Sequence, residues 1–490
     1  MSTPAPAPAE SLPPGTTGST RARWIVLAVV ALAQLMVVLD GTIVNIALPQ
    51  AQQALGMSDS DRSWVVTLYA LAFGALLLLG GRVADYWGRK RSFLTGMAGF
   101  ALASALGGVA TTPEMLLAAR GLQGAFAALL APAALAILSV TFPGGRDRVK
   151  AFAVYGTIAG GGAAIGLLLG GVLTEYFSWH WCLLVNVPIA AVAIAAGIPL
   201  LKESRAEGDT RYDLPGAVLV TAGLASVVYG FSRAEYGWAR PDTIAFLAAG
   251  AVLLAVFLRV EAVSNHPLLP LRVLADRVRG GAYLVSILVG AALLGGLLYL
   301  TLYFQIVLGL SPLASGLASL PMTAAIIVSA ALVSKALPVV GPRILMTAGP
   351  LTAAAGLLYL SRISVEGNYV LEVLPGQLLL GIGLALVFVP LQNVALAGIE
   401  SRDAGVASAA VTATQQIGGS IGTAVFTALY AAAAATGSGE PATLAPLVEG
   451  YSSVFLAAAV ALAAAAPISW FMVRVDRRMF STSSEAVHLG

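Results

Sequence analysis

The sequence predicts an all-α polytopic membrane protein, and three observations support this prediction. Hydrophobic residues make up 58% of the 490 residues, charged residues make up only 10%, and the mean hydropathy is +0.87. A soluble domain carries about 25% charged residues, so most of this chain does not face water. Apolar runs long enough to cross a bilayer as helices recur along the whole chain.

A window of about 20 residues per span gives fourteen candidate membrane helices. They lie near residues 24–48, 64–81, 92–110, 115–141, 151–174, 181–201, 214–232, 243–260, 281–307, 314–337, 343–361, 371–397, 404–432 and 453–474. The first run follows two arginines and resembles a signal peptide, but its length and the many later spans favour a first membrane helix. Residues 1–23, rich in Pro, Ala, Ser and Thr, are predicted to form a disordered cytoplasmic tail.

The distribution of basic residues tests this topology. With the N-terminus in the cytoplasm and alternating spans, 22 of the 27 Lys and Arg residues lie inside, four lie outside and one, Arg120, lies within a span. The four outside are Arg62, Arg233, Arg240 and Arg362. The positive-inside rule therefore favours fourteen spans with both termini in the cytoplasm, whereas thirteen spans would scramble the asymmetry.

The spans group as six, two and six, because charged segments interrupt the chain after the sixth span and again after the eighth. These breaks lie at residues 202–213 and 261–279. We therefore predict an N-terminal six-helix bundle at 24–201, a linker with two inserted helices at 202–279, a C-terminal six-helix bundle at 280–474 and a cytoplasmic tail at 475–490.

Weak internal repetition accompanies this grouping. The matching positions are Gly88-Arg89-Lys90 with Gly341-Pro342-Arg343, Pro132 with Pro390, and Gly162 and Gly166 with Gly418 and Gly422. Repeated halves are typical of transporters that rock about a central site. The alternative is chance similarity between stretches rich in Ala, Gly and Leu.

The stretch from Gly81 to Arg91, GRVADYWGRKR, is a charged island between two apolar runs, and we expect a tight cytoplasmic turn there. Gly81 and Gly88 would let the backbone turn without a Cβ clash. Asp85 is expected to face the positive end of the next helix dipole. The basic residues that mark the cytoplasmic side are Arg89, Lys90 and Arg91.

Asp40 lies inside the first span, in LDGTIVNIALP. An ionised carboxylate in a span costs at least about 2.5 kcal/mol, so we expect it to be paired, protonated or in contact with water. A carboxylate held between burial and a nearby cation can load and release a proton. The alternative is an interfacial aspartate that caps the segment after the outer end of the helix.

Arg120 is expected to lie at the same depth as Asp40. From the rise of about 1.5 Å per helical residue and a hydrocarbon core of about 30 Å, both lie roughly 6–8 Å beneath the outer face. Their opposite charges at matched depth predict an ion pair. The alternative is that Arg120 extends to the outer headgroups without contacting Asp40.

Two further groups are candidates for functional positions. Glycines in the fifth span allow close helix packing and bending at a gate, or packing alone; they are Gly162, Gly166, Gly170 and Gly171. Polar residues in the spans could line a substrate cavity; they are Asn45, Gln123, Tyr299, Tyr303, Gln377 and Asn393. Tyr303 could equally be an interfacial anchor.

Several function classes lack their characteristic residues. The single cysteine, Cys182, allows no intramolecular disulfide, and three histidines without a Cys/His cluster give no sign of a metal site. No P-loop supports ATP-driven pumping, and no set of nucleophile, base and oxyanion donors supports an enzyme. We therefore expect no cofactor, no nucleic-acid partner and a chain that functions as a monomer in the lipid bilayer.

On these motifs the chain resembles the fourteen-helix drug:proton antiporters of the major facilitator superfamily, from about Trp24 to Arg478. The loop at Gly81–Arg91 is typical of the superfamily. Three further stretches are more specific to this branch, in addition to LDGTIVNIALP; they are Trp64-Val65-Val66-Thr67, Arg120-Gly121-Leu122-Gln123-Gly124 and Asn186-Val187-Pro188.

The resemblance implies the major facilitator fold and export of lipophilic drugs or antibiotics across a bacterial inner membrane, with protons as the exchanged ion. It implies that Asp40 takes part in proton coupling, that Arg120 supports it, and that Asp85 with Arg89 controls a cytoplasmic gate. Helices 1, 4, 9 and 12 would line the cavity. Two alternatives remain open: a transporter of a physiological metabolite, peptide or lipid, and a receptor or scaffold that does not transport.

The chain departs from the family pattern in three ways. Leu167 stands where the antiporter motif of helix 5 usually has proline, which puts the helix 5 kink in doubt. His180 stands where an arginine is common. The extra intramembrane acids of members specialised for dicationic drugs are absent from the sequence, which argues against a strongly cationic substrate.

Overall fold

The computed structural model describes residues 20–143, 145–205, 213–264, 267–269, 271–397, 404–436 and 444–475. Every regular element in these ranges is a helix. The two expected tails lie largely outside the described residues.

The first half of the chain forms six long helical segments. They are α1 (Thr20–Leu55), α2 (Asp59–Trp87), α3 (Arg89–Gly108), α4 (Pro113–Thr141), α5 (Gly145–Tyr176), and the short α6 (Trp181–Leu184) continued by α7 (Asn186–Leu200). Local sequence fixes several of these boundaries. Ser58 and Asp61 form a capping box at the start of α2, and Thr112 caps α4 just before Pro113.

A helical hairpin follows, made of α8 (Leu214–Arg233), the turn η1 (Ala234–Tyr236) and α9 (Pro241–Val263), with a short α10 (Leu271–Ala275) after it. α8 packs against α9 and also against α2 and α15 (Ala404–Thr436). The inserted hairpin therefore lies beside the boundary between the two halves.

The second half repeats the arrangement of the first. Its helices are α11 (Arg277–Leu302) extended by the π-helix η2 (Tyr303–Val307), α12 (Pro312–Val340), α13 (Pro342–Leu360), the π-helix η3 (Tyr369–Val373) leading into α14 (Leu374–Leu396), α15, and α16 (Ala445–Met472). A single glycine separates α12 from α13, as one glycine separates α2 from α3. Both glycines, Gly88 and Gly341, have positive φ, at 127° and 86°.

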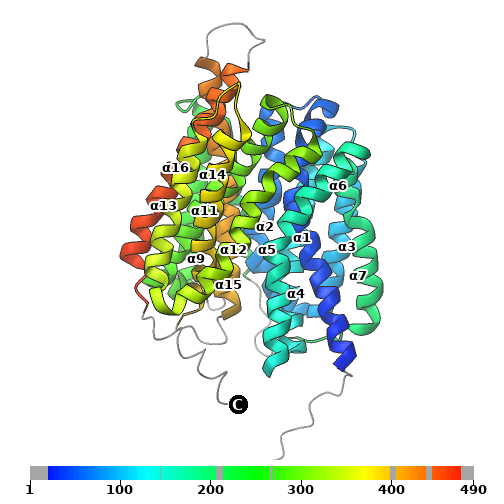
Figure 1. The fold of residues 1–490 in the computed structure, drawn as a ribbon. Helices are drawn as coiled ribbons and strands as arrows, with labels where there is room; N and C mark the ends of the chain where they lie inside the picture. The colour runs from blue at the N-terminus through cyan, green and yellow to red at the C-terminus, as the bar shows by residue number, and fades with distance from the viewer. Residues whose placement is uncertain are drawn as a thin grey trace, which may run out of the picture.

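Packing within the halves follows the same pairs. α1 contacts α5 as α11 contacts α15, and α3 contacts α4 as α13 contacts α14. Two equivalent contacts, α2 with α15 and α5 with α12, join the halves, which lie side by side in Figure 1. The weak sequence repeat therefore corresponds to a structural repeat, because equivalent helices of the two halves make equivalent contacts.

Thirteen helices in the described ranges are long and apolar enough to cross a membrane. The first-half helix outside this set is α3, which has 20 residues but begins with three basic ones, Arg89, Lys90 and Arg91. It packs between α4 and α7 as a sixth helix of that half. The number of fourteen spans and the cytoplasmic position of both termini stay predictions.

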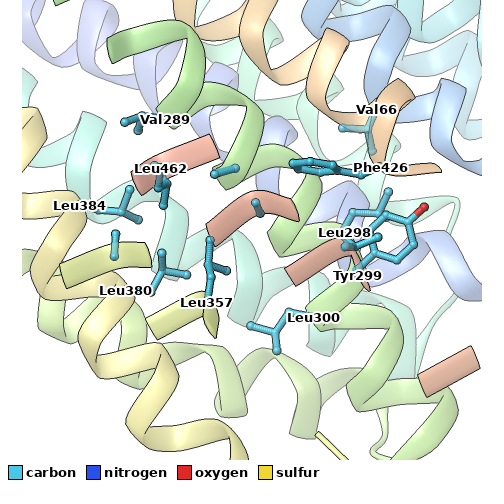
Figure 2. Packing of buried hydrophobic residues seen from close by; sticks show 14 of the residues in the cluster. Val66, Val289, Leu298, Tyr299, Leu300, Leu357, Leu380, Leu384, Phe426 and Leu462 are labelled. Carbon is cyan, nitrogen blue, oxygen red and sulfur yellow. The ribbon is translucent and has the colours of Figure 1, made fainter. Parts of the chain in front are cut away.

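The largest buried apolar cluster crosses the boundary between the halves. It includes Leu39 of α1. It also joins Val66 of α2 to Leu298 and Tyr299 of α11 and Phe426 of α15 (Figure 2). In lipid, close packing rather than release of water holds helices together. The two halves are therefore closely packed against each other where this cluster lies.

Candidate functional site

Asp40 and Arg120 form an ion pair inside the first half. Arg120 Nη1 lies 2.6 Å from Asp40 Oδ2. Asp40 in α1 is 0% exposed and Arg120 in α4 is 2% exposed. The predicted pairing is thus present, and the alternative in which Arg120 extends away from Asp40 does not describe this structure.

Neutral polar side chains donate further hydrogen bonds to the Asp40 carboxylate. Gln123 Nε2 and Asn186 Nδ2 both donate to Asp40 Oδ1, at 2.8 and 2.9 Å. The same two amides also donate to Ser104 Oγ, at 2.7 and 3.3 Å. The carboxylate is therefore held by α1, α3, α4 and α7 together, in a network that is buried throughout.

Arg120 has partners on both sides of its guanidinium. Its Nε donates to the Val65 carbonyl at 3.1 Å, and its Nη1 donates to Gln123 Oε1 at 2.8 Å as well as to Asp40. The guanidinium carbon lies 4.3 Å from the centre of the Tyr69 ring, a cation–π distance. Burying two charges is expensive unless hydrogen bonds satisfy their remaining polar atoms, and this arrangement provides such bonds.

The position next to Asp40 is open. Gly41 is exposed, and a Cβ built on it would meet no atom within 4 Å. The carboxylate is thus covered on its network side, while the adjacent turn of α1 borders free space. Protonation of Asp40 would leave Arg120 facing a neutral acid, which removes the attraction that holds α1 to α4 at this level.

The four glycines singled out in α5 all lie at close helix contacts. Cβ atoms at Gly162, Gly166 and Gly170 would meet Val38, Thr42 and Ile43 of α1. A Cβ at Gly171 would lie 2.7 Å from the backbone of Leu313 in α12. Three of these glycines therefore set the approach of the Asp40 helix, and the fourth sets a contact between the halves.

The chain runs as helix through Leu167, where the antiporter pattern has proline. Leu167 is buried, and its carbonyl faces the close approach of Gly316 from α12. The contact of α5 with α12 thus forms without a proline at this position.

The charged loop differs in detail from the sequence prediction. Gly81 does not turn the chain, because it lies within α2; only Gly88 has the positive φ of a turn. Asp85 does not face the start of α3: it lies in the last turn of α2 and accepts hydrogen bonds from Arg89, with an ion-pair distance of 3.0 Å. Glu203 instead accepts from the first backbone amides of α3, because the chain after α7 returns to this point.

The same loop contacts the segment that follows the inserted hairpin. Arg82 Nη2 donates to the Pro267 carbonyl at 3.1 Å. The Lys90 ammonium donates to the Ile198 carbonyl near the end of α7 at 2.6 Å. The loop therefore joins α2 and α3 to the segment after α9 and to the end of α7.

The residues expected to line a cavity are dispersed. Gln123 belongs to the Asp40 network, and Asn45 is buried with its amide bonded to the Gly41 carbonyl. Asn393 is exposed and bonds within its own helix to the Val389 carbonyl. The remaining candidates are buried in the second half, where Tyr299 bonds Thr427, Tyr303 bonds the Ser364 carbonyl and Gln377 accepts from Tyr369. Their role in substrate binding stays a prediction.

Three hydrogen-bonded contacts connect the halves on the side nearest Asp40. Gln305 Nε2 donates to the Ile46 carbonyl at 2.9 Å. Thr427 Oγ1 lies 2.8 Å from Ser63 Oγ. Glu175, at the end of α5, accepts from Ser311 Oγ and Leu313 N at the start of α12, at 2.6 and 2.9 Å. By the predicted topology this is the outer side, so the two halves are closed against each other there.

Sequence reasoning did not include several of these residues in the site. Asn186 was recognised only as part of a motif, and Ser104, Tyr69, Glu175 and Glu203 were not recognised at all. The available signal was weak: an asparagine in an otherwise apolar span is the one feature that distinguishes Asn186.

Comparisons with known proteins agree with this description. A family model described as Major Facilitator Superfamily matches residues 30–423. A puromycin resistance protein of Streptomyces alboniger is 45% identical over 459 residues, covering 92% of this chain and 91% of that protein. A cephamycin export protein of Amycolatopsis lactamdurans is 37% identical over 480 residues, covering 97% of each chain.

Solved structures give the same fold at low sequence identity. A bacterial homologue of the human lysosomal transporter Spinster superposes with a TM-score of 0.67 at 16% identity, covering 95% of this chain and 99% of that chain.

Proposed function

Because the chain belongs to the major facilitator superfamily, we propose that it is a secondary-active exporter of lipophilic antibiotics or drugs that works by proton antiport. The chain is a membrane transporter of this superfamily, and its relatives include proteins named for puromycin resistance and cephamycin export. These names support an antibiotic as substrate. The proton as coupling ion rests on the site within the chain.

The observation that carries this proposal is the buried pair of Asp40 and Arg120. Fully buried carboxylates are rare in membrane spans and usually serve proton or ion pathways. Here the carboxylate has a cation at 2.6 Å and two amide donors, so both of its oxygens have partners within the chain. Loss of its charge would change the contact between α1 and α4, which is the kind of local event that can bias a conformational equilibrium.

The proposed cycle moves the halves as rigid bundles, residues 24–201 against residues 280–474. In the state described here the halves contact each other on the outer side through Gln305, Thr427 and Glu175. Separation of the halves there would expose the Asp40 site to the outside. A proton taken up by Asp40 in that state would then be released into the cytoplasm. Each proton moving inward gains about 2.3 kcal/mol per 100 mV of membrane potential.

The cytoplasmic loop would act as a latch rather than as the coupling site. Asp85 lies in the last turn of α2 and Arg89 begins α3. Asp40 lies toward the other end of the bundle, since its partner Arg120 donates to the Val65 carbonyl near the start of α2. The loop also contacts Pro267 through Arg82. It is therefore placed to sense movement of the connecting segments.

The test is drug accumulation and resistance in a sensitive host that expresses Asp40→Asn. We expect proton-coupled export to fall by at least about tenfold, because the neutral amide cannot exchange a proton. Glu114→Gln, a matched change at an exposed position of α4, serves as the control and should export normally. Export by Asp40→Asn at the level of the parent protein would refute the assignment.

Inside-out vesicles distinguish drug antiport from uptake of a physiological solute. In energised vesicles, a substrate of the antiporter should release part of the stored proton gradient on addition, and Asp40→Asn should abolish that release. An increase of the gradient on addition of substrate would indicate the opposite coupling.

A further inference from the structure

Arg62 is a second buried arginine, and it lies outside the Asp40 site. It is the fourth residue of α2, on the outer side, and is 2% exposed, although its place in the sequence suggests a solvent-facing residue. Its Nη1 makes both of its polar contacts, at 2.9 Å from Asp59 Oδ1 and 2.9 Å from Gln52 Oε1. Its Nε and Nη2 are buried and have no hydrogen-bond partner among the described residues.

Three tyrosines of the second half lie near this arginine. Tyr299 of α11, Tyr430 of α15 and Tyr451 of α16 pack together, with ring centres 5.4 to 5.8 Å apart. All three lie within electrostatic range of the Arg62 guanidinium. The hydroxyl of Tyr451 also has no hydrogen-bond partner within the described part of the chain. These rings thus pack on one another, and Arg62 donates no hydrogen bond to their hydroxyls among the described residues.

The residue beside Arg62 makes the opposite kind of contact. Ser63 bonds Thr427 across the boundary at 2.8 Å, and Tyr299 donates to the same threonine at 3.2 Å. These buried hydroxyls therefore have partners. The bond between Ser63 and Thr427 is lost when the halves separate, whereas the bond between Tyr299 and Thr427 lies within the second half. Ser63 thus stabilises the closed contact between the halves, whereas its neighbour Arg62 destabilises it.

Arg62 destabilises the closed contact because burying hydrogen-bond donors without partners is unfavourable. Each such donor destabilises the closed state, and water would satisfy it as soon as the outer side opened. Asp59 is half-exposed and already accepts from Gln52, so it does not need Arg62 to remain stable in the closed state. The closed contact therefore carries a penalty at Arg62 that opening removes.

We propose that Arg62 is a destabilising element built into the outer gate, which keeps the closed contact weak enough to open in each transport cycle. The outer gate is the closed contact between the two halves on the outer side. The bond between Ser63 and Thr427 stabilises this contact, and the unpaired donors of Arg62 reduce its stability. This inference rests on the proposed alternating-access function, but it concerns the equilibrium of the gate and not the coupling ion.

The experiment measures the gate directly. Spin labels at Glu114→Cys and Glu366→Cys, two exposed outer positions in different halves, report the distance between the halves by pulsed electron resonance in nanodiscs, in a Cys182→Ala background. Arg62→Met keeps the length of the side chain and removes its donors. We expect the ratio of long to short distances to fall at least about fivefold in this variant.

Thr427→Val is the matched variant of opposite sign. It removes the hydrogen bond across the boundary at nearly constant volume, so the long-distance population should rise about threefold. Arg62→Lys, which keeps the charge with fewer donors, should shift the ratio in the direction of Arg62→Met by a smaller factor, and it provides a second reading if Arg62→Met does not fold. An unchanged or larger long-distance population in both Arg62 variants would overturn the proposal.

These distances are measured without drug or proton gradient. A failure of Asp40→Asn to impair export would therefore refute the proposed coupling and leave the gate result standing, and the converse also holds.

Discussion

Arg120 and Arg62 are equally buried, yet their surroundings differ. Arg120 donates to a carboxylate, an amide and a backbone carbonyl, all from its own half of the molecule. Arg62 has one bonded nitrogen and two buried nitrogens without partners among the described residues, and its neighbour Ser63 bonds Thr427 of the other half. The difference teaches that an arginine buried beside a carboxylate is satisfied within its own half, whereas the arginine next to the boundary between the halves is not.

Replacing each arginine by methionine is the strongest test of this comparison. Arg120→Met leaves the Asp40 carboxylate buried without its cation, which should cost about 3–5 kcal/mol of stability and abolish export. Arg62→Met removes unpaired donors and should leave the thermal midpoint in detergent unchanged or higher. Similar losses of thermal stability in both variants would break the comparison.

Asn186→Leu tests whether neutral donors around Asp40 contribute as much as the geometry indicates. A hydrogen bond to a charged group is worth about 1.5–3 kcal/mol, and Asn186 donates one at 2.9 Å. We expect a loss of that size in thermal unfolding measurements. Asn393→Leu is the control, because its exposed amide bonds only within its own helix and its loss should cost less than about 0.5 kcal/mol.

Gly166→Ala tests the contact that positions the Asp40 helix. The added methyl group would meet Thr42 and the Leu39 carbonyl in α1, immediately before Asp40. Overpacking of this kind costs about 1–3 kcal/mol, and export should fall several-fold because α1 must move. Gly161→Ala, five residues earlier in the same helix, meets open space and should be neutral or slightly stabilising. Equal effects in a resistance assay would contradict this role of Gly166.

The sequence predicts the Asp40 pair because charges in spans are so few that depth alone selects the partner. The same argument does not extend to Asn186 or Ser104, since neutral polar residues are common in the spans and each could bond its own helix. Glu203 was missed for a related reason: it caps α3 from 113 residues away, and only the folded chain brings it there. The burial of Arg62 was not predicted either, because position along a helix does not reveal what packs around a residue at its end.

The fold was more predictable than the site. Hydropathy and basic residues locate the long helices, and the matched glycines before Arg89 and Arg343 mark equivalent turns in both halves. Contacts between the halves, such as Glu175 with Leu313, depend on the conformational state and leave no periodic pattern in the sequence.

Arg89 is a third arginine to compare with Arg120 and Arg62, and it pairs with Asp85 in contact with solvent. Loss of this pair is expected to have the smallest effect on stability. The Arg89 and Asp85 side chains are 17% and 38% exposed at an ion-pair distance of 3.0 Å. Water compensates such pairs, so Asp85→Asn should cost less than about 1 kcal/mol. If the loop is a latch, the variant should still lower turnover at unchanged drug spectrum, measured as export rates for several compounds. A changed spectrum at normal turnover would show that Asp85 acts on substrate choice instead.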